Sequence, residues 1–446
     1  MATIETNPQL GAQVKADAKE FVLHSWSVQN AIDPIPVAGA EGRYFWDYEG
    51  KRYLDFASQL VNVSIGHGHP KVIAAIKEQA EKLCTIGPPM ATEPRSTLAR
   101  MLAEVTPGNL KMSFFTNGGA EANENAIKVA RWVTGRHKII ARYRSYHGAT
   151  GGAITLTGDP RRWHAEPGLP GVVRMLDPYT YRCPAGHPDP CPVCSGGPHL
   201  EEILEYEGPH TVAAVILETV VGTNGIIVPP DGYLQSIRET CDRHGILLIC
   251  DEVMAGFGRT GRWFACENWD VVPDILTVAK GINSGYVPLG AMIVSEPIAA
   301  QLRDRFLAGG LTYSGHPLAC ASAVASIEAF QEEGVVENSA AMGEVLAEEL
   351  PRLAERHLSI GEVRGKGLFW GLELVRDRET REPLVPFNAT GEAFAPVAQL
   401  GKAAMERGLY LMTHWNVIIV APPLTITREE LDEGLEKLDE ALTQAA

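Results

Sequence analysis

One stretch, residues 245–290, constrains the fold of this chain more than any other. It opens with an apolar run, Ile246–Cys250, that ends in two carboxylates, Asp251 and Glu252. This profile is typical of a strand buried on both faces in a parallel sheet, with acid placed where the strand stops. A second apolar run ends at Lys280. Because an ammonium group loses hydration in such a place, we expect Lys280 to be paired or used covalently.

Apolar strand-like runs alternate with helical stretches from about residue 71 to residue 326. Alternation over this length predicts an α/β domain with a mostly parallel central sheet. The candidate strands are Lys111–Phe115, Lys138–Arg142, Ala213–Leu217, Gly245–Cys250, Ile275–Val278 and Ala291–Val294. Ligands of such sheets bind beyond the carboxyl ends of the strands, so we expect the site there.

The two ends of the chain differ from this middle part. Residues 1–25 indicate a helical or mobile arm, and aromatic-rich segments around the Glu49–Gly50 turn predict a hairpin. After Ser326, amphipathic helices and short strands predict a smaller α+β domain, whose last helix begins with a Thr427 cap and Glu430 three residues on. We therefore divide the chain into an N-terminal arm with part of the small domain (1–60), a large domain that we expect to carry the binding site (61–326) and a C-terminal small domain (327–446).

Composition argues against several classes of protein. The 446 residues carry a formal net charge of −16, which disfavours nucleic acid and anionic membrane surfaces as partners. No apolar run reaches the roughly eighteen residues of a membrane span, and the first residues lack the pattern of a secretory signal. Eight cysteines without an export signal favour reduced thiols and a cytoplasmic location.

Small motifs at two strand ends have the character of a cofactor site. Gly119 and Ala120 lie at a turn into a helix, where free backbone N–H groups make a seat for phosphate. A plain turn is an equally good interpretation of these two residues alone. Tyr146 and His147 follow the strand Lys138–Arg142, where an aromatic ring can stack on a flat cofactor. The alternative is a half-buried surface pair.

Asp251 and Lys280 carry the strongest chemical signal. Asp251 can pair with a protonated ring nitrogen, which makes the ring an electron sink, and Lys280 can form an imine with a carbonyl group. A helix cap or metal ligand is the alternative for Asp251, and a surface lysine for Lys280. Their joint occurrence at buried strand ends, downstream of a phosphate seat, favours an imine-forming active site. Thr312 lies in a turn that can add a further phosphate contact or simply precede a helix.

Taken in order, these motifs resemble the class III aminotransferases, pyridoxal-phosphate enzymes of fold type I. The resemblance covers nearly the whole chain and rests on FFTNGGAEANENAIKVAR, YHG, ILETVVG, ICDEVMAGFGRTGRWFA, DILTVAKG, LTYSGHPL and APPLTIT. It implies pyridoxal 5′-phosphate as cofactor, a large domain beside a smaller α+β domain, and transfer of an amino group from a donor amine to a keto acid.

The resemblance also implies roles for particular residues. Lys280 matches the lysine that binds the cofactor covalently, and Asp251 the partner of its pyridine nitrogen. Gly119 and Ala120 match the phosphate-binding turn, although Ala120 lacks the hydroxyl of many relatives. Thr312 matches a residue that reaches the phosphate of the neighbouring subunit, which implies a homodimer, or a tetramer built from dimers, with active sites at the interface. The remaining cofactor-binding matches are the ring-stacking Tyr146 with the adjacent His147, Val253 on the opposite ring face, and Glu218.

Two departures from the family pattern concern the substrate. Many relatives carry a carboxylate-binding arginine shortly before the APPL motif, whereas the segment around Met412 has none. The loop containing Gln59 and Leu60 resembles the loop that lines the pocket of taurine and other ω-aminotransferases. We therefore expect an ω-amine donor (taurine, β-alanine or another primary amine), with pyruvate or 2-oxoglutarate as acceptor. A racemase, decarboxylase or aminomutase on the same scaffold is the first alternative, and a metal- or nucleotide-binding protein is the second.

A cysteine-rich segment has the spacing of a metal site. Cys183, His187, Cys191, Cys194 and His199 together offer ligands that zinc prefers. The segment is also rich in proline and glycine and has the character of a family insertion. We therefore interpret these residues as reduced thiols in a loop near the dimer surface and predict no metal. The other cysteines indicate small core residues: Cys84, Cys241, Cys250, Cys266 and Cys320.

Overall fold

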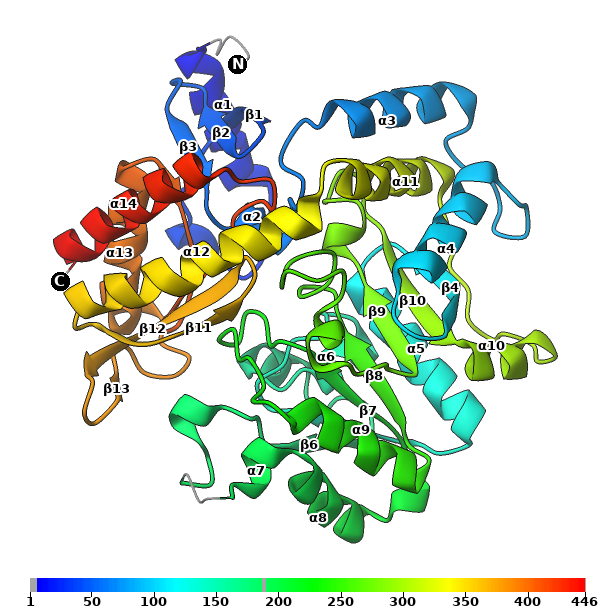
Figure 1. Ribbon diagram of the computed structural model, residues 1–446. Coiled ribbons are helices and arrows are strands. Elements are labelled where there is room, and N and C mark those ends of the chain that lie inside the picture. The colour runs from blue at the N-terminus through cyan, green and yellow to red at the C-terminus, as the bar shows by residue number, and fades with distance from the viewer. Residues whose placement is uncertain (1–5, 187–189, 446) are drawn as a thin grey trace.

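A computed structural model of the chain describes residues 6–186 and 190–445. A seven-stranded sheet lies at the centre of its larger part, with strand order β4-β10-β9-β8-β7-β5-β6 (Figure 1). The strands are β4 (Leu110–Thr116), β5 (Lys138–Arg142), β6 (Val172–Met175), β7 (Val212–Glu218), β8 (Leu247–Asp251), β9 (Ile275–Val278) and β10 (Gly290–Ser295). Neighbours from β9 to β6 pair in parallel, and β10 is antiparallel to both β4 and β9. The predicted mostly parallel sheet is confirmed.

The predicted strands agree with this sheet, with two instructive differences. The strand expected from Gly245 begins at Leu247, because Gly245 adopts φ +59° and ends the preceding helix. Strand β6 was not predicted, because it is short, lies at the sheet edge and has only Met175 fully buried. An edge strand of this kind carries no long apolar run, so the sequence gives it little signal.

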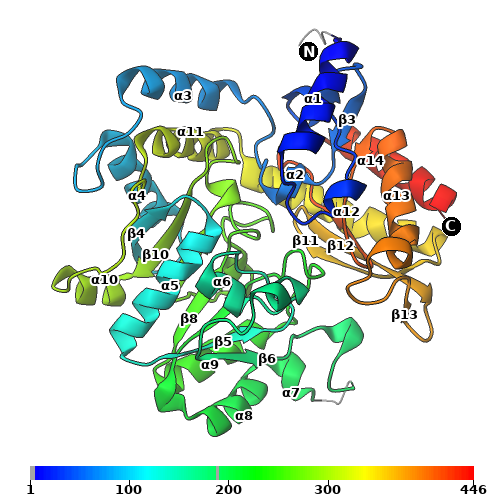
Figure 2. The ribbon, with the colours of Figure 1, turned by 180° about the vertical axis from the view of Figure 1, so that it is seen from behind.

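Helices cover both faces of the sheet, which explains why the central strands are apolar throughout. On one face α5 (Gly119–Thr134) packs Val129 and Ala130 against the sheet, in a cluster that includes Ile249. On the other face α9 (Tyr233–His244) packs beside Leu248. Helix α9 lies in front of the sheet in Figure 1, and α5 lies in front of it in Figure 2, which views the molecule from behind. The further helices of this part are α3 (Pro70–Lys82), α4 (Glu93–Val105), α6 (Gly151–Leu156), α7 (Pro192–Ser195), α8 (Gly197–Glu207), α10 (Glu296–Arg303) and α11 (Pro317–Glu332).

The smaller part combines both ends of the chain (Figure 1). One sheet has the order β1 (Val37–Glu41), β2 (Tyr44–Asp47), β3 (Arg52–Asp55) and β14 (Leu409–Tyr410). The other has the order β11 (Ile360–Lys366), β12 (Phe369–Asp377), β16 (Val417–Val420) and β15 (Met412–His414), with β13 (Glu382–Pro383) paired to β12. Its helices are α1 (Pro8–Phe21), α2 (Ser58–Val61), α12 (Val335–Arg356), α13 (Ala395–Glu406) and α14 (Arg428–Ala445). Because β14 pairs in parallel with β3, the early hairpin and the late chain share one sheet.

Local predictions at the two ends are confirmed. The hairpin around the Glu49–Gly50 turn is the antiparallel pair β2–β3. At the start of α14, the Glu430 N–H donates to Thr427 Oγ1 at 3.3 Å, and the Thr427 N–H donates to Glu430 Oε2 at 3.0 Å. The boundary predicted at residue 326 falls inside α11, and the division into domains stays a prediction. Within the described residues, no helix combines the length and apolar character that crossing a bilayer requires.

Candidate active site

A cavity of about 1090 Å³ opens at the carboxyl ends of the central strands. The smaller part forms the side of the cavity opposite the sheet, with residues of the Ser58–Val61 segment, the 388–394 loop and β15. Ten of the twelve residues predicted for the site line it: Leu60, Gly119, Ala120, Tyr146, His147, Glu218, Asp251, Val253, Lys280 and Met412. The other two, Gln59 and Thr312, lie outside the lining of this cavity in their own chain.

Asp251 is the most firmly held side chain of the site. It ends β8 and is buried, with Oδ2 2.8 Å from both His147 Nδ1 and Asn123 Nδ2. Oδ1 accepts the Val253 N–H at 3.0 Å. Thr277 Oγ1 in turn donates to Asn123 Oδ1 at 2.7 Å, which fixes the orientation of the amide. A carboxylate with this many donors is held in one orientation and can face a cationic group in the cavity.

Asn123 was missed by the sequence analysis. It lies on the second turn of α5, four residues after Gly119, and is fully buried. Its Nδ2 also donates to the His147 carbonyl oxygen at 2.7 Å. The signal that could have revealed it is a polar residue on a helix face that otherwise presents Ala122, Ala126 and Ile127. A buried amide needs partners, so its presence there indicates a polar network.

Lys280 follows β9 in a short 3₁₀ turn and adopts φ +44°. A positive φ is unfavourable for lysine, and such strain is typical of a side chain that must be aimed at a site. Burial lowers the pKa of Lys280, the Asp251 and Glu218 carboxylates oppose this, and the Arg161 cation adds to the lowering. Among the described residues Nζ has no hydrogen-bond partner. The amine is therefore closer to its neutral, nucleophilic form than a surface lysine.

Glu218 supports the cavity wall through the backbone. Its Oε1 accepts the Tyr146 N–H at 2.9 Å and its Oε2 accepts the Gly222 N–H at 2.8 Å. Burial raises the pKa of Glu218, His147 opposes the rise, and the Asp251 charge adds to it. The position of the Tyr146 ring therefore depends on a carboxylate from the neighbouring strand β7.

Glu252 directly follows Asp251 but points away from the cavity. It accepts hydrogen bonds from Thr219 Oγ1 at 2.8 Å, the Ala265 N–H at 2.6 Å and the Cys266 N–H at 2.8 Å. Burial raises the pKa of Glu252 to about 7. Adjacent side chains at a strand end point to opposite faces, so one of the two acids serves the cavity and the other supports a loop.

The start of α5 forms a seat for an anion. Gly118 precedes the helix without a capping side chain, and the N–H groups of the first turn have no partner within the helix. A Cβ added at Gly119 would lie 2.7 Å from Val253 Cγ2, and one at Gly148 would lie 2.4 Å from Ala120 Cβ. Only glycine leaves the backbone this accessible beside the cavity.

The two residues outside the cavity lining have other surroundings. Gln59 adopts φ +59° and its Nε2 donates to Asp55 Oδ2 at 2.9 Å, so that the neighbouring Leu60 faces the cavity instead. Thr312 is exposed in the loop before α11. The substrate role of Gln59 and the cross-subunit role of Thr312 stay predictions.

The cavity contains an arginine that the sequence analysis did not single out. The Arg161 guanidinium lies 3.8 Å from the centre of the Tyr146 ring, its Nε donates to Asp159 Oδ2 at 2.9 Å, and its NH2 donates to Thr223 Oγ1 at 3.0 Å. Arg161 comes from a 3₁₀ turn, Pro160–Ala165, far in sequence from Met412. No motif marked it, because its place depends on how this turn folds over the sheet.

A family model described as Aminotransferase class-III matches residues 27–442. The chain belongs to the class-III aminotransferases. Among solved structures, it is similar to a taurine:2-oxoglutarate aminotransferase from Bifidobacterium kashiwanohense in complex with PLP and glutamate. That match has a TM-score of 0.93 and 44% identity, and covers 100% of this chain and 99% of the other.

Two curated relatives add to the picture of this aminotransferase. A taurine–pyruvate aminotransferase of Bilophila wadsworthia is 34% identical over 97% of both chains. A leucine/methionine racemase of Thermococcus litoralis is 37% identical over 92% of this chain and 90% of the relative. The family thus includes relatives with different reactions.

The cofactor of this aminotransferase is pyridoxal 5′-phosphate. The residues of the cavity fit it in three respects: an anion seat at α5, a fixed carboxylate at Asp251 and a lysine amine without a hydrogen-bond partner among the described residues. When bound, the cofactor supplies a ring that accepts electrons from the reacting carbon.

Proposed function

We propose that this aminotransferase moves the amino group of an ω-amine with an acidic end, such as taurine or β-alanine, to pyruvate or 2-oxoglutarate. The observation that carries the proposal is the Arg161 cation in the cavity that also contains Lys280. The donor and acceptor named for the similar taurine aminotransferases support it.

Asp251 and Lys280 would divide the work of the reaction. The fixed Asp251 carboxylate would keep the pyridine nitrogen protonated, because its partners prevent it from turning away. Lys280 would attach the cofactor covalently, and after the donor displaces it, would move a proton to and from the substrate carbon. A lowered pKa suits both tasks, since the amine must be neutral to attack the cofactor and to accept the substrate proton, and gives that proton up more readily once it holds it.

Arg161 would bind the acidic end of the donor. Asp159 and Thr223 hold the guanidinium from one side, and the Tyr146 ring covers it from another. A cation held in this way binds a sulfonate or carboxylate with little loss of side-chain freedom. It would replace the arginine that many relatives place before the APPL motif.

A panel of donors and acceptors tests this assignment. Taurine, β-alanine and 1-phenylethylamine would each be supplied with pyruvate or 2-oxoglutarate, and the alanine or glutamate formed would be measured. We expect kcat/KM to be highest for the donors with an acidic end. A preference for 1-phenylethylamine would contradict the proposal.

Racemisation is a second candidate, because one relative is a leucine/methionine racemase. A racemase needs no keto acid, since the amino group returns to the same molecule. Incubation of L-leucine or L-methionine with the holoenzyme, without acceptor, would be followed by chiral chromatography. Formation of the D-enantiomer at a rate that matches transamination would favour racemisation; we expect none without acceptor.

We also propose that the enzyme is a homodimer whose active sites each include Thr312 from the partner, and that it works in the cytoplasm. The loop that carries Thr312 also exposes Phe306 (93%) and Tyr313 (57%), which a partner would cover. Mass measurement by light scattering would distinguish a dimer from a tetramer.

Mixed dimers would test the shared site. Lys280→Ala and Thr312→Ala subunits would be unfolded and refolded together. In the mixed dimer, one site has both Lys280 and the partner residue Thr312 intact. We expect cofactor affinity at that site to exceed that of the Thr312→Ala homodimer. Equal affinity would argue against a shared site.

A further inference from the structure

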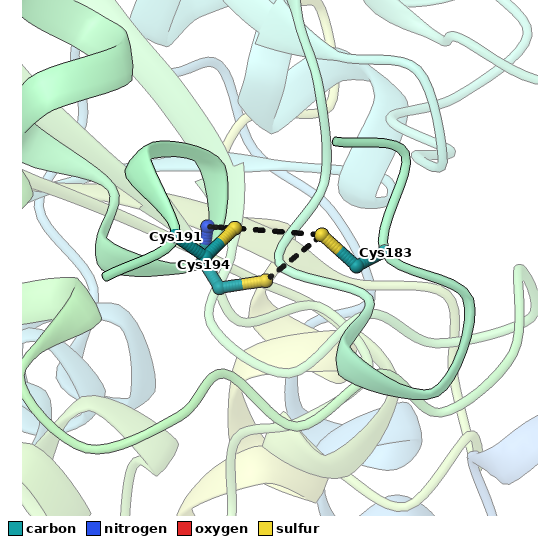
Figure 3. A group of neighbouring side chains, drawn as sticks. All are labelled: Cys183, Cys191 and Cys194. Atoms are coloured by element: carbon teal, nitrogen blue, oxygen red, sulfur yellow. Dashed lines mark hydrogen bonds between the residues drawn. The ribbon is translucent and has the colours of Figure 1, made fainter. Parts of the chain in front are cut away.

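Three buried or half-buried thiols converge in the larger part, outside the lining of the cavity (Figure 3). Cys183 follows a 3₁₀ turn, Thr180–Arg182, while Cys191 and Cys194 belong to the start and body of α7. The Cys183 sulfur lies 3.4 Å from that of Cys191 and 3.7 Å from that of Cys194. All three sulfurs lie within 4.8 Å of one another.

These distances suit a single tetrahedral ion. With zinc–sulfur bonds of about 2.3 Å, sulfur atoms on one tetrahedron lie about 3.8 Å apart. The observed separations are too long for a disulfide bond, and three sulfurs cannot all be joined in pairs. No fourth cysteine of the described residues joins the group, which favours zinc over an iron–sulfur cluster with four cysteine ligands.

The backbone of α7 is shaped to support thiolate ligands. The Cys194 N–H donates to the Cys191 sulfur at 3.3 Å, which would stabilise negative charge on that sulfur. Gly196 ends the turn with φ +79°, and a Cβ there would lie 2.8 Å from the Tyr233 ring. The turn is therefore packed tightly against α9, and the position of two sulfurs is fixed before any ion binds.

The two segments that supply the sulfurs are attached to different parts of the molecule. Beside Cys183, the Arg182 Nε donates to Glu373 Oε1 of β12 at 2.5 Å. On the other side, the Gly197 N–H after α7 donates to Ser236 Oγ of α9 at 3.1 Å. An ion held by the three sulfurs would therefore link a segment that is bound to β12, in the smaller part, with a turn that is bound to α9, in the larger part.

We propose that Cys183, Cys191 and Cys194 bind one zinc ion that has a structural role. The three thiols would lose three protons as three zinc–sulfur bonds form, and one nitrogen or oxygen ligand would complete the tetrahedron. Sequence alone favoured reduced thiols without metal; the convergence of the three sulfurs changes that interpretation. His199 is not a ligand, because its Nε2 accepts the Leu176 N–H at 3.1 Å. His187 lies outside the described residues.

Thiolate is the form of cysteine that binds a divalent cation, so each zinc–sulfur bond replaces a proton. Zinc binding should accordingly weaken as the pH falls.

The test uses the purified full-length holoenzyme. Zinc would be measured by mass spectrometry after dialysis, and again after chelation and addition of Zn²⁺ under reducing conditions. We expect about one zinc per chain, and X-ray absorption with about three sulfur ligands at about 2.3 Å. Zinc far below one per chain after reconstitution would overturn the proposal, as would iron in its place. Two fewer titratable thiols in the unfolded, unreduced protein would indicate a disulfide and would also overturn it.

Variants assign the ligands. Cys194→Ser should lose the zinc, whereas Cys84→Ser should keep it. Cys84 lies outside the group and is exposed, so the prediction that it is a core residue was wrong. Zinc retained equally in both would overturn the proposal. If Cys194→Ser does not fold, chelation of the wild-type enzyme decides: the Tm should fall and recover on adding Zn²⁺, while kcat at 25 °C stays unchanged because no cysteine of the group lines the cavity. An unchanged Tm would exclude a structural role.

Discussion

The floor and the rim of the active-site cavity are built in different ways. The floor (Gly119, Tyr146, Asp251 and Lys280) consists of residues at or just after the carboxyl ends of β4, β5, β8 and β9, four strands of one sheet. The rim (Leu60, Arg161, Met412 and His414) comes from three segments far apart in the chain. The pairing of the strands brings the floor residues together. The position of the rim residues depends on how loops and the sheet that contains β15 pack over the floor.

The two regions also differ in how firmly their groups are held. Asp251 accepts three hydrogen bonds, from Asn123 of α5, from His147 after β5 and from the Val253 N–H after β8. Beside the rim residue Leu60, Ser58, Gln59 and Val61 all adopt positive φ. The buried Nε2 of His414, also in the rim, has no hydrogen-bond partner among the described residues. The firmly held Asp251 suits chemistry common to the family, and the loops of the rim suit recognition of one substrate. Backbone strain does not separate the two regions, because Lys280 of the floor also adopts φ +44°. Variants can test this division.

The largest effect is expected for Lys280→Ala. If Lys280 attaches the cofactor and moves the proton, its loss should lower kcat by roughly 10³-fold or more. Transamination would be measured at saturating donor and acceptor. Lys111→Ala, which changes an exposed lysine of β4, is the control and should keep full activity. A Lys280→Ala enzyme with near wild-type turnover would contradict the assignment of the reaction chemistry to the floor residues.

Two adjacent acids give the next test. Asp251→Asn should lower kcat by roughly 10²-fold, because an amide cannot hold a pyridinium as a carboxylate does. Glu252→Gln should instead cost about 1–3 kcal/mol of stability, because its amide would face three donors where the carboxylate accepts from them. Turnover and urea unfolding would be measured for both variants. The same loss of turnover in both would contradict the assignment of opposite faces.

The floor could be predicted from the residues themselves, whereas Leu60 and Met412 of the rim were predicted only through the family resemblance and Arg161 and His414 were not predicted, for a physical reason. A buried strand leaves an apolar run, so Asp251 and Lys280 were conspicuous as charges at the ends of such runs. The family resemblance then supplied their roles. Arg161 follows no such run, and its place over Tyr146 depends on contacts with Asp159 and Thr223. Nothing local in the sequence records these contacts.

Gln59 and the cysteine segment show the same limit. The sequence placed Gln59 in the pocket loop, yet the positive φ of this segment turns its amide to Asp55. The spacing of Cys183 and Cys191 could not reveal that their sulfurs lie 3.4 Å apart. In both cases the outcome depends on side-chain direction in irregular backbone, which has no periodicity to read.

A smaller effect is expected at the rim for Arg161→Leu. Loss of a charged hydrogen bond to the donor's acid should raise the KM for taurine by about 10- to 100-fold. The KM for 1-phenylethylamine, which has no acid, should change little. Arg162→Leu is the matched control, because this neighbour pairs with Glu166 and does not line the cavity. An equal rise for both donors would show that Arg161 shapes the cavity rather than binding the acid.

The last prediction concerns the free energy of unfolding. Its dependence on pH should have opposite directions for His414, in the rim, and for Glu252, which supports a loop below the floor. Burial lowers the pKa of His414 to about 4. Between pH 6.5 and pH 4, the imidazole is therefore protonated in the unfolded chain but stays neutral in the folded chain. The contribution of His414 is therefore complete above pH 6.5 and is lost as the pH falls to 4. Burial raises the pKa of Glu252 to about 7, so its contribution is complete below pH 4.5 and is lost as the pH rises to 7. Each shift corresponds to about 3 kcal/mol at most.

Urea unfolding of His414→Phe and Glu252→Gln between pH 4 and pH 8 would separate the two groups. Relative to wild type, His414→Phe should lose less stability as the pH falls, because phenylalanine has no group that becomes protonated on unfolding. Glu252→Gln should lose less as the pH rises from 4.5 to 7, because it has no proton to release. The two difference curves should therefore slope in opposite directions between pH 4.5 and pH 6.5. Curves of the same slope would mean that the charge state of the cavity as a whole, rather than each buried group, sets the pH dependence.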